Sequence, residues 1–166
     1  MSKALAPAIQ NLKGLFSINA NITGKLSEPK FSTHTALTAA SFDLPKLGLA
    51  IKNVKLNIDK DVISPYVFSA YAESGTGQLS ISGQSKVIET NNNDFLPKNI
   101  KLKITGNNFE ASKSSELQLA LSPDLNIEIN NQDINIFGDI SIPFAKFEPK
   151  DKSQMVTISN DIVIIG

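Results

Sequence analysis

The sequence contains no arginine, cysteine or tryptophan, and only one histidine. The absence of cysteine excludes disulfides, thiolate zinc sites, iron–sulfur clusters and cysteine nucleophiles. A single histidine excludes multi-histidine metal sites and leaves little acid–base chemistry near neutral pH. The 16 lysines balance 16 acidic residues, and this neutral surface without arginine argues against nucleic acid as a partner. We therefore expect neither a metal nor a cofactor.

Long apolar runs are also missing. The longest, residues 47–51 and 162–165, fall far short of the roughly 18 apolar residues that a membrane-spanning helix needs. The first ten residues lack the apolar segment of a cleavable secretion signal. These features predict either a cytosolic protein or an internal piece of a longer one. The end of the chain, directly after an apparent strand, favours the piece.

The dominant pattern is an alternation of apolar and polar residues with period two, which is typical of β-strands with one apolar face. In the first such segment, Phe16, Ile18, Ala20 and Ile22 alternate with polar residues. About ten to twelve short strands are predicted in this way. Because the connections between them are short, neighbouring strands must be mostly antiparallel. The expected fold class is therefore all-β.

Turns and interruptions divide these strands. We expect turns at 74–77 and 130–133, a loop over 90–99, and breaks at Pro45, at 122–124 and at Pro143. The apolar phase changes at Lys52-Asn53, which predicts a bulge or a turn. Only Leu5, Ile9 and Leu12 have helical spacing, which leaves room for one short N-terminal helix.

Few residues are candidates for chemistry. His34 falls on the polar side of its strand, where a solvated side chain is the expectation. Asp59 and Asp61 lack the flanking residues of a calcium loop and are interpreted as part of a polar turn. The Gly-rich segment 74–77 is followed by neither a lysine nor a helix, as a phosphate-binding loop would require. No nucleophile elbow is present, so we expect a protein that is not an enzyme.

The apolar positions of the strands carry almost no charge, whereas the intervening positions carry Lys, Asp, Glu, Asn, Ser and Thr. One face of the sheet is therefore expected to be apolar throughout. Two arrangements satisfy this pattern. Two such faces can pack together in a closed sandwich, or one open sheet can leave its apolar face lining a groove.

The last third contains the strings NNFEA, SELQLALSPDLNIEI, DINIFGDISIPFAKFEPKD and SNDIVIIG. The middle contains FDLPKLGL, and further on GTGQL leads to Gly83. In order and spacing, these strings resemble the conserved C-terminal region of the TamB family, an AsmA-like family that provides the inner-membrane subunit of the translocation and assembly module. The resemblance spans nearly the whole chain.

The resemblance implies a curved sheet folded like a taco over a hydrophobic interior. It also implies a periplasmic segment of an inner-membrane-anchored protein of a Gram-negative bacterium, with residues 1–166 forming one β-rich slice of the longer body. The implied partners are phospholipid acyl chains moving between the two membranes and a TamA-like outer-membrane barrel protein. The family has no catalytic residues to transfer to this sequence.

A shared strand phase predicts which side chains line this interior: Phe16, Ile18, Leu49, Ile51, Phe68, Leu79, Ile81, Ile100, Leu102, Ile104, Leu117, Leu119, Leu121, Leu125, Ile127, Ile129, Ile134, Ile136, Ile140 and Ile142. The main alternative is a scaffold or chaperone that holds unfolded outer-membrane proteins at a sheet edge. A purely structural β-domain with a filled core is the third. Exposed edges also predict edge-to-edge association of the chain with itself.

Overall fold

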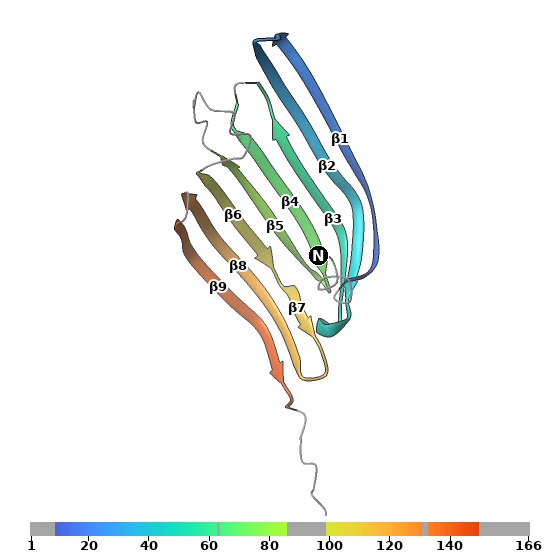
Figure 1. Cartoon of the computed structure of the whole chain (residues 1–166). Coiled ribbons are helices and arrows are strands. Elements are labelled where there is room, and N and C mark those ends of the chain that lie inside the picture. Colours follow the sequence, from blue (N-terminus) through green and yellow to red (C-terminus); the bar gives the residue numbers. More distant parts are fainter. Residues whose placement is uncertain (1–8, 63, 86–98, 131–132, 150–166) are drawn as a thin grey trace, which may run out of the picture.

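The computed structural model describes residues 9–62, 64–85, 99–130 and 133–149. These residues form one curved antiparallel sheet of nine strands (Figure 1), which confirms the predicted all-β class. A single-turn 3₁₀-helix, η1 (Pro45–Leu47), connects the second and third strands. The strands are β1 (Gln10–Lys25), β2 (Glu28–Leu44), β3 (Leu49–Lys60), β4 (Tyr66–Ser74), β5 (Gly77–Ser85), β6 (Ile100–Asn107), β7 (Phe109–Lys113), β8 (Leu117–Asn130) and β9 (Asp133–Phe147).

The strands form a meander. Strands β1 to β6 pair in chain order, and β8 then pairs with β6 and β7 along one side and with β9 along the other. Strands β6 and β7 therefore lie end to end beside β8. Within the described residues, β1 and β9 each have a single partner and form the two edges. The closed sandwich is thus the wrong alternative, since one sheet holds all the described strands.

Bulges bend the strands on the β1–β3 side. The register shifts between Leu37 and Ala40 of β2 and between Lys52 and Lys55 of β3. The two shifts adjoin in the sheet because Ala40 pairs with residue 54. Asn53 has a φ of 50° at this point, a left-handed conformation that asparagine tolerates better than most residues. The predicted phase change at Lys52-Asn53 is confirmed as a bulge, and aligned bulges bend neighbouring strands together.

Two prolines that were expected to break strands do not. Strand β8 continues through Pro123, which lies opposite the joint between β6 and β7. No ladder hydrogen bond from the missing N–H is needed there, since pairing with β6 stops at Asp124 and pairing with β7 starts at Leu121. Pro143 lies at a register shift in the edge strand β9, where proline is also tolerated.

Other expectations also need correction. Segments predicted as separate strands join into long ones, such as the 17-residue β2, so the described residues contain nine strands rather than ten to twelve. Leu12 belongs to β1, so the predicted N-terminal helix is wrong at this residue, and residues 1–8 of that prediction lie outside the described ranges. Most of the predicted loop over 90–99 and all of the chain after 149 also lie outside them.

Directly paired residues of an antiparallel sheet share a face. The register therefore assigns every paired side chain to one of the two faces of the sheet. Two neighbouring rows that cross the whole sheet from β1 to β9 differ sharply in composition. One row is Ile18, Thr35, Ile58, Phe68, Gly83, Leu102, Ile127 and Ile136. The next row, on the opposite face, is Asn19, His34, Asp59, Val67, Gln84, Lys101, Glu128 and Asn135.

Candidate functional site

The candidate site is the apolar face, which we call the inner face. The register places 19 of the 20 side chains predicted to line the interior on this one face through their pairing partners. The twentieth, Ile142, lies at the β9 register shift and has no direct partner in the ladder. The alternation seen in the sequence therefore does bring these residues together in space.

The sequence reasoning missed several members of this face in β2 and β3. Leu37, Phe42, Val54, Leu56 and Ile58 pair with residues of the inner face. Their alternation is visible in the sequence. At a bulge, one extra residue moves every later side chain of the strand to the opposite face. The sequence alone therefore does not show whether these five residues lie on the apolar face.

No second layer covers the inner face among the described residues. Near the edges its apolar side chains are more than half exposed: Ile18 is 59% exposed in β1 and Ile136 is 60% exposed in β9. Toward the middle of the sheet, Phe68 and Leu102 are only half-buried. Large apolar side chains rarely stay this accessible over a contiguous surface unless something binds there.

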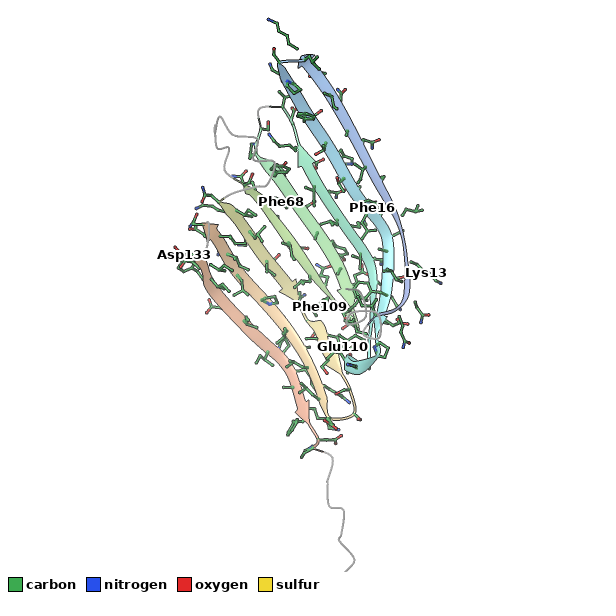
Figure 2. The ribbon with its side chains drawn as sticks, in the orientation of Figure 1. Lys13, Phe16, Phe68, Phe109, Glu110 and Asp133 are labelled. Atoms are coloured by element: carbon green, nitrogen blue, oxygen red, sulfur yellow. The ribbon has the colours of Figure 1, made fainter. Side chains whose placement is uncertain are left out.

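The sheet curls so that segments far apart in its strand order touch. Strand β7 passes beyond the short β4–β5 hairpin and contacts η1 and β3. The Ser74 hydroxyl, at the end of β4, donates a hydrogen bond of 2.7 Å to the carbonyl oxygen of Glu110. Figure 2 shows Glu110 at this end of the sheet, which we call the η1 end.

Burial is concentrated on the apolar face. Six of the eight buried side chains lie on this face, near the bulges and the strand ends; the two exceptions are Ala36 and Ala120. The six are Ala40, Leu49, Ile51, Ser74, Ser85 and Ser112.

Charge is almost absent from the inner face. Among the described residues that the register assigns to it, Lys60 is the only charged one. It lies at the last position of β3, opposite Thr33 of β2 and Tyr66 of β4, at the end of the sheet away from η1. The remainder of the described inner face is largely apolar, which suits groups that need no hydrogen bonds, such as hydrocarbon.

The outer face, in contrast, carries paired charges. The Lys101 ammonium lies 2.5 Å from a Glu128 carboxylate oxygen, and that of Lys103 lies 3.3 Å from Asp124. These side chains are between about a third and two thirds exposed, so such pairs contribute little to stability. They keep this face hydrated rather than forming a site.

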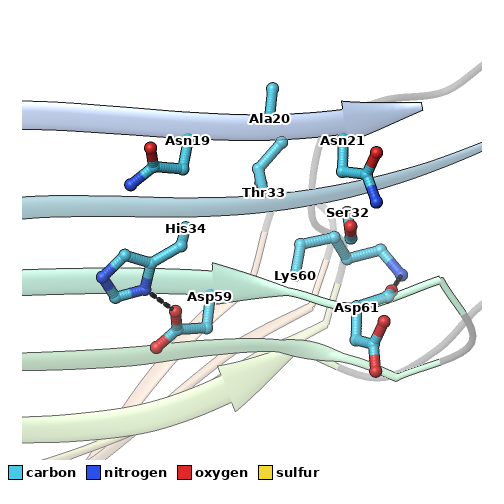
Figure 3. A pocket seen from close by; sticks show the side chains of 9 residues that line it. All are labelled: Asn19, Ala20, Asn21, Ser32, Thr33, His34, Asp59, Lys60 and Asp61. Atoms are coloured by element: carbon cyan, nitrogen blue, oxygen red, sulfur yellow. Dashed lines mark hydrogen bonds and ion pairs between the residues drawn. The ribbon is translucent and has the colours of Figure 1, made fainter.

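A polar hollow on the β1–β3 side contains the single histidine (Figure 3). The ring of His34 pairs with the Asp59 carboxylate, both about half exposed, with Asn19 and Asn21 of β1 nearby. Within the described ranges, no group of three or more His, Cys, Asp or Glu side chains could hold a metal ion. The described residues of the hollow therefore provide no such metal-binding cluster.

Comparison with known proteins settles the family. The family model described as the TamB C-terminal domain matches residues 69–166. This match covers more than half of the chain. The chain belongs to the TamB family. The match begins within β4, and the inner face of β4–β9 continues without interruption into β1–β3, which precede the match.

Neither the curated proteins nor the solved structures gave a match. TamB-family proteins are inner-membrane-anchored periplasmic components of the translocation and assembly module, and they act with TamA-type machinery in transport and assembly. In the part of this chain that the structure describes, no helix is long and apolar enough to cross a membrane.

Proposed function

We propose that this chain is a non-enzymatic periplasmic slice of a TamB-like protein, in which residues 1–166 form one unit of a longer body. Its inner face shields phospholipid acyl chains during their transport between the inner and outer membranes. The observation that carries this proposal is an apolar surface that runs across the sheet from β1 to β9, with one charged residue and no covering layer among the described residues.

The energetics favour a continuous surface. Exposing an acyl chain of roughly 16 carbons to water costs on the order of 12 kcal/mol, at about 0.8 kcal/mol per methylene. A conduit must remove most of this cost at every step of the path. Rows such as the one through Ile58, Leu102 and Ile127 provide apolar contact from one edge of the sheet to the other. Isolated pockets would leave the chain in water between them.

The test places a charge on each face at neighbouring positions of β8. Ile127→Asp puts a carboxylate on the inner face, and Asn126→Asp puts the same group on the outer face beside Lys103. We expect Ile127→Asp to lower the affinity for a fluorescent phospholipid by at least about tenfold, because a charge has to be desolvated by bound hydrocarbon. Asn126→Asp should bind as the original chain does.

Circular dichroism and urea unfolding serve as fold controls. Because Ile127 is only half-buried, the Ile127→Asp chain should still fold, at reduced stability. A folded Ile127→Asp chain that binds and transfers phospholipid unchanged would contradict the proposal. Complete unfolding by this substitution would instead support a filled structural core.

A second function is favoured by the two edges. Strands β1 and β9 each expose one unpaired side among the described residues. An unfolded outer-membrane strand, with alternating apolar and polar residues, could add to such an edge, so the alternative is a scaffold for barrel assembly with a TamA-like partner. Lipid binding requires the inner face, whereas strand addition requires an edge, so substitutions at Ile127 and in β9 separate the two.

A further inference from the structure

Lys60 is an exception on a surface that otherwise excludes charge. Four lysines of the outer face, Lys101, Lys103, Lys113 and Lys146, have carboxylate partners within 4 Å. For Lys60, the described residues provide no such ion pair; its ammonium donates instead to the backbone carbonyl oxygens of Asp61 at 2.8 Å and Ser64 at 2.6 Å. Within the described ranges, its positive charge is therefore held in place but has no carboxylate partner within 4 Å.

The surroundings of Lys60 suit an amphiphile. The ammonium lies 5.7 Å from the centre of the Tyr66 ring, which in turn stacks on Phe68. Beyond Phe68, the inner face continues through residues 56 and 54 to Ile51 near the η1 end. From Lys60 to Ile51, β3 spans roughly 30 Å, about twice the 15 Å depth of one lipid leaflet. A charged group at Lys60 would thus have ample apolar surface beside it for its hydrocarbon.

We infer that Lys60 binds the phosphate group of a phospholipid at the rim of the sheet, with the acyl chains lying on the inner face toward the η1 end. This inference rests on the proposed function and names the headgroup contact that this function leaves open. A phosphate complements the single cation, and an ammonium has three donors, of which the two backbone carbonyls occupy two. The contact orients each lipid, because only one end of this surface carries charge.

The chain provides a matched control. Lys55 lies on the outer face of the same strand, 6.0 Å from the ring of Tyr71 on β4, so it repeats the Lys–Tyr arrangement on the polar side. Lys55→Gln and Lys60→Gln thus remove the same charge from the same pair of strands, on opposite faces. Lys60→Arg retains the charge and should retain binding.

The experiment measures displacement of a fluorescent acyl probe from the full chain by dioctanoyl phosphatidylglycerol, by dioctanoylglycerol, which lacks the phosphate, and by inorganic phosphate. We expect Lys60→Gln to weaken the binding of phosphatidylglycerol by about tenfold, which corresponds to the loss of a charge-assisted hydrogen bond. Dioctanoylglycerol should compete equally well in all variants. Lys55→Gln should change the affinity for neither lipid.

The outcomes separate this inference from the proposed function. If the original chain binds neither lipid, both fail. If it binds both lipids and Lys60→Gln leaves phosphatidylglycerol unchanged, the headgroup site is overturned while the apolar face stands. Displacement of the probe by inorganic phosphate alone would overturn the assignment to a lipid, since free phosphate has no hydrocarbon to compete for that face.

Discussion

Gly48 and Lys113 are in backbone contact although η1 and β7 are separated by several strands of the sheet. A Cβ atom on Gly48 would lie 2.3 Å from the carbonyl oxygen of Lys113. Gly48 also has a φ of 67°, the left-handed conformation that ends η1. This contact stabilises the curl of the sheet at the η1 end, because it joins the segment after η1 to β7 beyond the β4–β5 hairpin.

Replacing Gly48 with alanine should therefore destabilise the chain by about 2 kcal/mol or more, from the left-handed backbone and from the clash with Lys113. Urea unfolding followed by circular dichroism measures this change. Lys46→Ala, two residues earlier and exposed, is the control and should stay within about 0.5 kcal/mol of the original chain. Equal stability of the Gly48→Ala chain would show that the two sides of the sheet do not need this contact.

Glu73 on the outer face provides a prediction about pH. Its pKa is lowered from the ordinary value, first by a hydrogen bond from the Tyr71 hydroxyl, at 2.8 Å, and then by one from the Asn53 amide, at 2.6 Å. Lys55 and Lys52 add smaller contributions in the same direction, and partial desolvation opposes them. A lowered pKa in the folded state means that this carboxylate stabilises the fold above its ordinary pKa of about 4.3 and loses that effect as the pH falls through the lowered value.

Tyr71→Phe removes the main donor, so the Glu73 carboxyl should then titrate at higher pH than in the original chain. Carbon-detected NMR titration of the Glu73 side chain measures this pKa directly. Because the gap between the folded and unfolded pKa values narrows, the stability that Glu73 contributes above its ordinary pKa, and that is lost on acidification, should be smaller in Tyr71→Phe. Identical titration of Glu73 in the two chains would mean that the Tyr71 hydrogen bond does not set its pKa.

The edge strands predict association of the chain with itself. Strands β1 and β9 present unpaired backbone groups and exposed apolar residues such as Ile18 and Ile136, and edges of this kind pair with further strands. Analytical ultracentrifugation should show oligomers that grow with concentration. The double substitution Ile18→Lys and Ile136→Lys should shift the chain toward the monomer. A monomer that persists at the highest soluble concentration would refute edge pairing.

The alternation of apolar residues was sufficient to predict an all-β fold and to group many residues of the inner face, because a period of two assigns faces within a regular strand. It failed across the bulges of β2 and β3, where Leu37, Leu56 and Ile58 were missed. It could not distinguish a sandwich from an open sheet. That choice depends on whether two apolar faces meet, which is a matter of topology rather than of local pattern. The resemblance to the TamB family supported the open sheet.

The prolines show a second limit of the sequence. Pro123 and Pro143 were interpreted as strand ends because proline cannot donate to a ladder. The structure places Pro123 opposite the gap between β6 and β7, and Pro143 at an edge bulge, where no donor is required. Lys60 was missed for a related reason: it continues the phase of Leu56 and Ile58, but a lysine at the end of a strand carries no signal of which face holds it until the register is known.

The most direct test uses a phospholipid with a nitroxide on its acyl chain, added to chain with labelled methyl groups. Ile81 and Ile127 lie on the inner face, and Val67 is a methyl-bearing residue on the outer face. Our account predicts strong paramagnetic broadening of the Ile81 and Ile127 methyl signals and little broadening of the Val67 signals. Equal broadening on both faces, or none at Ile81 and Ile127 at saturating lipid, would contradict it.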